Sequence, residues 1–236
     1  MDGFEVLDEF SNEELEVLVK LILDKGALTE TLTGSEEYEK YKPDHKRYVN
    51  RIKKELSEFA ANSFATLFRG HGVSYREMLI DVCKKTKTPF NEKSSLERIE
   101  NALLEKVLED TWENLSAQEK EDLFKDTPMG DIGGMGAGAL IGIFRTEGFA
   151  SYQLTLGIVN AIAKAILGRG LPLVANAALA RALGVLTGPI GIALTALWTA
   201  IDIAGPACRV TVPATIYIAA LRRVHQSDQY KEFAFQ

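Results

Sequence analysis

The chain has 236 residues, of which 46% are hydrophobic and 25% are charged, and it carries a net charge of −6. This composition excludes an intrinsically disordered chain, because there is enough apolar side chain to build a core. The acidic balance also argues against nucleic-acid binding, which needs clustered lysine and arginine.

Charge and glycine divide the chain into parts of different character. Residues 1–128 hold 28 acidic and 19 basic side chains, a net charge of −9, and 5 of the 19 glycines. The remainder holds 5 acidic and 8 basic side chains, a net charge of +3, and 14 glycines. We predict an amphipathic helical domain over 1–128, an apolar glycine-zipper helical region over 129–225 and a polar tail over 226–236.

The start of the chain and the two cysteines indicate the compartment. Residues 1–5 are acidic and lack the apolar segment of a signal peptide, so no signal peptide is expected. Cys83 and Cys208 are far apart in sequence and form neither a disulfide framework nor a metal-ligand spacing. Since reduced cysteines are typical of the cytoplasm, we expect a cytoplasmic protein. If its apolar half contacts lipid, it would associate with the inner face of the cytoplasmic membrane.

Helix-start signals make the first half all-α. A serine followed three residues later by glutamate, the pattern of a capping box, occurs at Ser11–Glu14, Ser94–Glu97 and Ser116–Glu119. Apolar residues then recur at intervals of three and four residues. We predict helices over 11–26, 44–68, 75–88 and 96–112, with a polar connector over 28–43.

The second half consists of apolar segments separated by glycine and proline. Ala182–Ile201 is uncharged for 20 residues, which reaches the length of a membrane-spanning helix, but Pro189, three glycines and three threonines dilute its apolarity. Residues 210–216 are rich in β-branched side chains, so a strand is the alternative to a helix there. We predict helices over 130–144, 149–167, 171–183, 187–203 and 207–224, and an all-α fold for the whole chain.

Four glycines in the second half predict a helix-packing groove. Gly130, Gly134, Gly138 and Gly142 recur at every fourth position, which places them along one side of a helix. Each glycine costs roughly 0.8–1 kcal/mol of helix propensity relative to alanine. Close approach of another backbone, or insertion into a membrane, would offset that cost.

The loop after residue 68 is the best candidate for a ligand site. Arg69 and Arg76 lie on either side of Gly70-His71-Gly72 before and at the start of the next helix, where exposed N–H groups and guanidinium groups would bind an anion such as phosphate, with His71 as a further candidate. The alternative is a structural helix end, in which the glycines supply positive φ and a side chain bonds a carbonyl.

The sequence gives little support for a catalytic site, a metal site or a cofactor site. A catalytic pairing of His71 with Asp81 or Cys83 lacks an orienting group and an oxyanion hole, so we assign no catalytic residue. The three histidines have no ligand spacing, so we assign no metal site. Gly134–Ala139 fits the pattern G-x-G-x-x-A, but no strand precedes it and no Gly-Lys-Ser/Thr of a P-loop follows, so we expect no cofactor.

Charged residues near the end of the apolar region suggest one buried contact. Asp202 and Arg209 are seven residues apart among apolar residues, and a buried pair would reduce the cost of burying either charge alone. The alternative is a charge that reaches the surface. Arg222 and Arg223 are expected at a solvated helix end, with contact to anionic lipid as the alternative.

Several of these motifs together resemble a known family. They are Phe68–Gly72 with Tyr75-Arg76, Leu79–Val82, Thr111-Trp112 and Arg209–Ala214 with Leu221–Arg223. This set is similar, in the same order, to the YaaW family of bacterial proteins, over roughly Leu7 to Arg223. The family's central region is grouped distantly with ubiquinol–cytochrome c chaperone domains, which implies an all-α core and a chaperone-like role. The resemblance implies no reaction and no ligand.

The sequence therefore leaves two main hypotheses for the function of this protein. In the first, the chain is a helical interaction protein whose apolar half meets a protein partner or a second copy. In the second, the chain is membrane-associated and inserts residues 130–221 into a bilayer or lays them on its surface. Anion binding at the loop around His71 is a further alternative, and an enzyme of unknown type is the least favoured.

Overall fold

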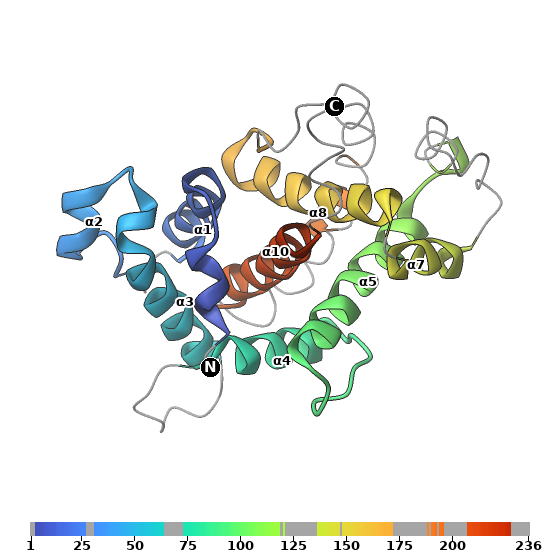
Figure 1. The fold of residues 1–236 in the computed structure, drawn as a ribbon, viewed down its shortest axis with the longest axis horizontal. Helices are drawn as coiled ribbons and strands as arrows, with labels where there is room; N and C mark the ends of the chain where they lie inside the picture. Colours follow the sequence, from blue (N-terminus) through green and yellow to red (C-terminus); the bar gives the residue numbers. More distant parts are fainter. Residues whose placement is uncertain are drawn as a thin grey trace. The chain divides into compact units, whose positions relative to one another are not determined.

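The computed structural model describes residues 3–26, 31–63, 73–118, 120, 136–146, 148–171, 188, 190–192, 194–195 and 207–227. All regular structure in these ranges is helical, which confirms the all-α prediction. The helices with defined bounds, shown in Figure 1, are η1 (Phe4–Asp8), α1 (Asn12–Lys25), α2 (Glu36–Tyr41), η3 (His45–Tyr48), α3 (Val49–Ser63), α4 (Tyr75–Lys85), α5 (Leu96–Asn114), α7 (Ala137–Arg145), α8 (Phe149–Leu167) and α10 (Cys208–Gln226).

The chain forms two compact units. Unit 1 comprises Met1–Ile99 and Trp198–Ile218, and unit 2 comprises Glu100–Leu197 and Ala219–Gln236. The chain therefore passes from unit 1 to unit 2 within α5, returns to unit 1 at Trp198 and passes to unit 2 again within α10. The predicted boundary after residue 128 lies outside the described residues, so the division into 1–128, 129–225 and 226–236 stays a prediction.

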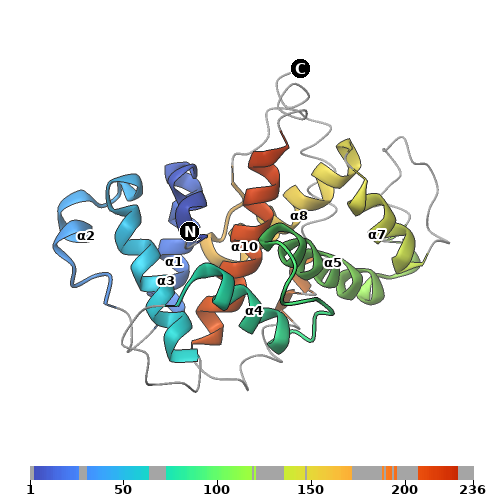
Figure 2. The same cartoon turned by 60° about the horizontal axis from the view of Figure 1, so that its bottom comes forward.

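Helix α1 begins where the sequence predicts. The Ser11 hydroxyl accepts a hydrogen bond from the Glu14 N–H at 3.2 Å, and the Glu14 carboxylate accepts one from the Ser11 N–H at 2.7 Å. This reciprocal capping box satisfies two N–H groups that the helix itself leaves unpaired. Within unit 1, α1 lies beside α3 and η3 (Figures 1 and 2), and its apolar face is buried.

Two helix starts in unit 1 differ from the predicted ones. Ser74 and Glu77 form a full capping box at the start of α4, a serine-to-glutamate spacing that the sequence contains but that we did not predict. At α5 the capping oxygen belongs to Ser95, which accepts from the Arg98 N–H at 3.3 Å, so the prediction of a capping box starting at Ser94 is wrong. Arginine in place of glutamate at the third helical position removes the reciprocal bond.

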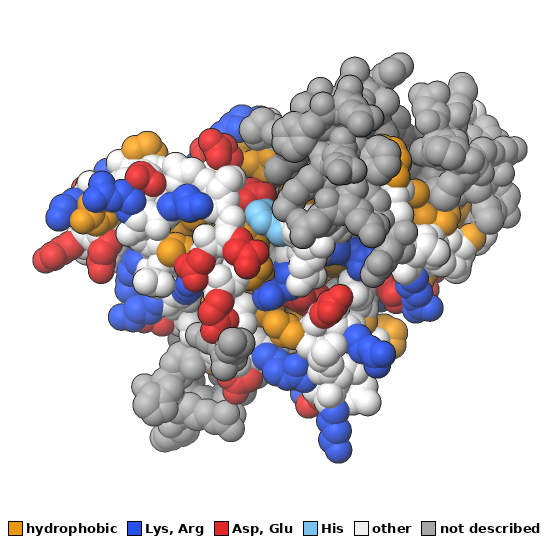
Figure 3. Space-filling model, in the orientation of Figure 1, with side chains coloured by type: hydrophobic (Ala, Val, Ile, Leu, Met, Phe, Trp, Pro, Cys, Tyr) orange, Lys and Arg blue, Asp and Glu red, His pale blue; other side chains and the backbone are white. Residues whose placement is uncertain are grey.

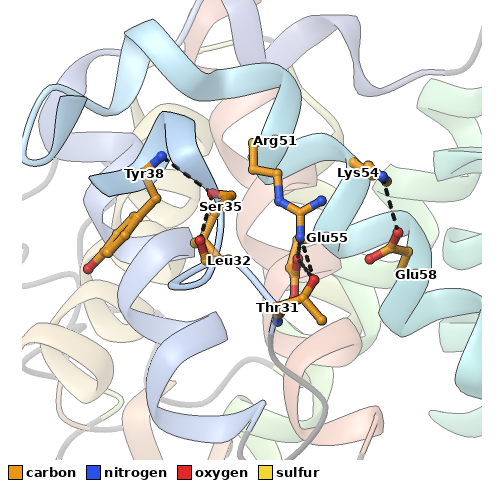
Figure 4. Close-up of polar contacts among 8 residues, drawn as sticks. All are labelled: Thr31, Leu32, Ser35, Tyr38, Arg51, Lys54, Glu55 and Glu58. Atoms are coloured by element: carbon orange, nitrogen blue, oxygen red, sulfur yellow. Dashed lines mark hydrogen bonds and ion pairs between the residues drawn. The ribbon is translucent and has the colours of Figure 1, made fainter. Parts of the chain in front are cut away.

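The connector between α1 and α3 contains a helix that the sequence analysis missed. The Ser35 hydroxyl accepts from the Tyr38 N–H at 3.3 Å and donates to the Leu32 carbonyl at 2.7 Å, which starts α2 (Figure 4). Glutamates in its first turn favour this start, because the N-terminus of a helix carries partial positive charge. The helix buries no side chain, so it has no apolar periodicity to detect.

Unit 2 has α8 among its buried elements. Every residue from Ser151 to Val159 is buried, and the helix ends at Gly168, whose φ of 72° is the left-handed conformation that glycine adopts readily. Among the residues that the structure describes, α8 is the one helix long and apolar enough to cross a membrane, and 72% of its apolar window is buried within the protein. Such burial is also typical of a core helix.

Helix α10 settles the choice between helix and strand at residues 210–216 in favour of helix. Its residues from Val210 to Leu221 are all buried. A helix that is apolar on every side belongs in an interior, where packing outweighs the weak helix propensity of β-branched residues. Pro213 lies inside this helix and lacks the N–H that would bond the carbonyl of Arg209.

Candidate functional site

The predicted anion site lies mostly outside the described residues, which include Arg76 but neither Arg69 nor His71. Arg76 lies in the first turn of α4, and its Nη2 donates to the carbonyl oxygens of Glu92 and Ser94, each at 2.6 Å. The guanidinium thus fastens the residues that precede α5. Anion binding at Arg69, His71 and Arg76 stays a prediction.

The predicted glycine groove is described in its second half. Gly138 and Gly142 lie in α7 and are exposed, and a Cβ built at either would meet no atom of the described chain within 4 Å. The helix starts at Ala137, because Gly136 has an extended backbone with ψ near 170°. The prediction of one continuous helix over 130–144 is therefore wrong at its start, because the extended Gly136 separates the preceding residues from α7. Gly130 and Gly134 lie outside the described residues, and the packing role of the four glycines stays a prediction.

The predicted pair of Asp202 and Arg209 also remains a prediction. Arg209 is exposed in the first turn of α10, which fits the alternative of a charge at the surface. Asp202 lies outside the described residues. Of the uncharged span 182–201, residues 188, 190–192, 194 and 195 are described, and all of them are helical.

The prediction of a solvated helix end at Arg222 and Arg223 is wrong. In unit 2, Arg222 Nε donates to the Glu100 carboxylate at 3.0 Å, and the two side chains are only 17% and 3% exposed. Arg222 lies in α10 and Glu100 in α5, 122 residues apart in sequence. The glutamate lowers the cost of holding the guanidinium away from water, which no local pattern indicates.

Arg223 makes a second set of contacts with three other elements of unit 2. Its guanidinium donates to Asn101 Oδ1 in α5 at 2.9 Å, to the Phe144 carbonyl at the end of α7 at 2.7 Å and to Ser151 Oγ in α8 at 2.9 Å. Ser151 Oγ also donates to the Phe144 carbonyl at 2.7 Å. We call Arg222, Arg223 and the residues that they contact, Glu100, Asn101, Phe144 and Ser151, the arginine cluster.

Unit 1 has a buried polar cluster of its own. Glu55 in α3 is 1% exposed, and its carboxylate accepts from the Thr31 N–H at 2.7 Å, the Thr31 hydroxyl at 2.9 Å and Arg51 Nη2 at 2.9 Å (Figure 4). Arg51 also bonds the Thr31 hydroxyl. These contacts anchor Thr31, which lies in the connector before α2, to α3, and they satisfy the hydrogen-bonding capacity of the buried carboxylate.

The thiols of unit 1 are poorly placed for nucleophilic chemistry. Cys83 is fully buried, and burial raises the pKa of its thiol to about 12, so the reactive thiolate is scarce near neutral pH. Cys208 is buried at the start of α10.

Lys85 lies beside Asp81 and Cys208. Burial tends to lower the pKa of Lys85, but hydrogen bonds with Asp81 and Cys208 outweigh the effect of burial, and the pKa is raised. Lys85 therefore carries a positive charge near neutral pH.

The visible surface is mixed in charge. Figure 3 shows acidic and basic side chains interspersed over the region of α1, α2 and α3. Lysine and arginine alternate there with glutamate and aspartate, as in Glu39–Lys42 and Lys54–Glu58 ion pairs. Ile192 is the one large hydrophobic side chain that is strongly exposed among the described residues, at 60%.

Comparison with known proteins shows the family to which this chain belongs. A UPF0174 protein of Helicobacter pylori strain J99 is 42% identical over 208 residues, which cover 86% of this chain and 82% of the relative. A family model described as ubiquinol-cytochrome C chaperone matches residues 44–216. The chain belongs to the UPF0174 (YaaW) family and to the ubiquinol-cytochrome C chaperone family.

The UPF0174 relatives extend to a second bacterial genus. YaaW of Escherichia coli strain K12 is 30% identical over 223 residues, which cover 92% of this chain and 86% of YaaW. This confirms the resemblance inferred from the sequence motifs. No solved structure matches the chain.

Two of the segments in which this sequence resembles the YaaW family lie at packed positions of unit 2. The motif Leu221–Arg223 supplies both arginines of the arginine cluster, and Trp112 is a buried aromatic of α5 with 4% exposure. The chaperone match begins at Asp44 and ends at Ile216, so α1 and α2 lie outside it.

Proposed function

We propose that this protein acts by binding rather than by catalysis, as a chaperone-like helical module that holds an apolar segment of a protein partner. The observation that carries the proposal is the match of residues 44–216 to a family described as ubiquinol-cytochrome C chaperone. The all-helical fold of the described residues is compatible with such a role.

The surface that we assign to the partner is the exposed side of α7 in the apolar region 129–225. This helix is apolar apart from Arg145, and the open space at Gly138 and Gly142 gives a partner helix room to approach its backbone closely. The partner is thus expected to offer an apolar helix with bulky side chains, which would fill the space beside the glycines.

A substitution at Gly142 tests this assignment without disturbing the core. A lysine there meets open space and improves helix propensity, so the variant Gly142→Lys should fold. Its charge would face the partner's apolar surface and oppose binding. Asn50→Lys is the matched control, because Asn50 is also exposed within a helix but lies in α3 of unit 1.

The measurement is light scattering of citrate synthase diluted from denaturant, with and without the purified protein. We expect the wild-type chain and Asn50→Lys to suppress aggregation at equimolar concentration and Gly142→Lys to suppress it at least threefold less. No suppression by the wild-type chain would refute the chaperone-like proposal. Equal suppression by both variants would refute the assignment to α7.

The membrane-associated alternative rests on residues 130–221 and on the length and apolarity of α8. Carbonate extraction of a cell lysate distinguishes it from the binding proposal. A protein that stays in the supernatant excludes insertion, whereas one that resists carbonate and dissolves in detergent excludes the purely soluble chaperone. Self-association through the same glycines would appear as a dimer that Gly142→Lys dissociates.

A further inference from the structure

Helix α7 has few interactions of its own that stabilise the helical conformation. It is nine residues long, shorter than an isolated helix needs for stability in water, and it contains Gly138 and Gly142. No side chain caps its N-terminus, where Gly136 is the capping residue. Only Leu140 and Phe144 are buried among its side chains. Contacts with the rest of unit 2 must therefore keep this helix in place.

Polar contacts with α5, α8 and α10 lie at the C-terminal end of α7, and the one from α8 is the hydrogen bond that Ser151 Oγ donates to the Phe144 carbonyl at 2.7 Å. Arg145 makes a two-pronged ion pair with Glu105 of α5, with Nε donating to Oε1 at 2.8 Å and Nη2 donating to Oε2 at 2.9 Å. One residue earlier, the Phe144 carbonyl accepts from Arg223 of α10 at 2.7 Å, and the guanidinium also lies 4.3 Å from the centre of the Phe144 ring. The Arg223 bond satisfies a carbonyl at the end of the helix, where carbonyl groups lack intrahelical partners, and the Arg145–Glu105 pair ties the same end to α5.

We infer that α7 opens from unit 2 as a local unit, while the rest of the unit stays folded. Contacts with Arg223 and Glu105 hold α7 closed, and we call these two residues the latch. A segment with little buried apolar surface and a short helix opens at a lower free energy than the core around it. Helix α7 also contacts α8 directly, and we expect α8 to stay folded when α7 opens, because most of the α8 side chains are buried in unit 2. Opening uncovers the side chains of Leu140 and Phe144.

Helix α7 opens and closes in this way whether or not the protein binds a client. The experiment is hydrogen–deuterium exchange of the full chain, followed by mass spectrometry, for the wild type and three variants. Arg223→Lys keeps the positive charge but loses the multiple bonds and the planar contact with the ring. Glu105→Gln removes the partner of Arg145 at a more exposed position, so it tests the latch with little risk of unfolding the protein.

Lys106→Gln is the matched control, because it removes an ion pair within α5, to Asp110, that does not involve α7. In the wild type we expect residues 137–145 to exchange faster than those of α8. We expect this exchange to rise about tenfold or more in Arg223→Lys and about two- to fivefold in Glu105→Gln, as fits an exposed pair, with no change in Lys106→Gln.

Two results would overturn the inference. The first is unchanged exchange of residues 137–145 in both latch variants, which would mean that neither residue holds the helix. The second is a rise of the same size in α8 and in the second half of α10, which would mean that α7 opens only when the whole of unit 2 unfolds.

Discussion

The guanidinium of Arg223 meets Phe144 in two ways at once. Its Nη2 donates to the Phe144 carbonyl at 2.7 Å, and its central carbon lies 4.3 Å from the centroid of the Phe144 ring. One arginine thus satisfies the backbone and contacts the ring of the same residue, which is itself fully buried.

The contact with the ring predicts a measurable coupling between the two side chains. Phe144→Leu keeps an apolar side chain, and the lost cation–π contact should cost about 0.5–1 kcal/mol beyond the effect of the altered packing. A double-mutant cycle with Arg223→Met, measured by urea denaturation, isolates that coupling. Additive effects of the two substitutions would show that the ring does not sense the charge.

The Arg222–Glu100 pair should be among the costliest polar contacts to break. Glu100→Gln leaves a nearly buried guanidinium without its counter-charge, and we expect the free energy of unfolding to fall by about 3 kcal/mol. Lys20→Gln, which breaks the exposed Lys20–Asp24 pair of α1, should cost under about 0.5 kcal/mol. Similar losses for both variants, by urea denaturation, would contradict the burial of the first pair.

The start of α5 can be assigned to one of two adjacent serines. Ser95→Ala removes the hydroxyl that accepts from the Arg98 N–H and should lower the free energy of unfolding by about 1 kcal/mol. For Ser94→Ala we expect a change within about 0.5 kcal/mol, because its carbonyl, which Arg76 binds, is retained. Thermal denaturation of both variants decides the assignment, and a larger loss for Ser94→Ala would reverse it.

His45 predicts a loss of stability in mild acid. Burial lowers the pKa of His45, although Glu16 and Asp44 act in the opposite direction, and its ring meets the hydroxyl of buried Tyr48. The unfolded chain therefore takes up this proton at a higher pH than the folded one. Stability is retained above the ordinary histidine value of about 6.5 and falls as the pH drops below it.

The measurement is the urea midpoint at pH 7.5 and pH 5 for the wild type and for His45→Phe, which cannot titrate. The wild type should lose more stability than the variant between these two values. An equal loss would assign the acid sensitivity to carboxylates elsewhere.

The buried thiols predict slow chemical modification. Because burial raises the pKa of Cys83 to about 12, the folded protein should react with a thiol reagent such as DTNB at pH 8 far more slowly than the unfolded chain. The expected difference is at least 100-fold. Fast reaction of the folded Cys208→Ser variant, which retains Cys83, would show that Cys83 is accessible.

Local rules account for most of what was predicted about unit 1. Ser11 and Glu14 are three residues apart and bond each other directly, so a pattern in the sequence is sufficient to find the helix start. The same rule applied to Ser74 and Glu77 would have found α4's cap. It fails at α2, where Ser35 caps the helix but Tyr38 stands at the position of the glutamate, and at Ser94, where the adjacent Ser95 is the capping residue.

The sequence by itself determined the all-α fold, the family and most helix positions, because capping and apolar periodicity act over three or four residues. Only the tertiary structure decided whether Arg222 and Arg223 are solvated or hydrogen-bonded within the protein, because their partners Glu100 and Asn101 lie 122 residues away. From sequence alone, two arginines at a helix end are expected to be solvated, and they are buried only where the fold brings hydrogen-bond acceptors to them. Burial and hydrogen bonding between distant segments depend on packing, which no short stretch of sequence contains.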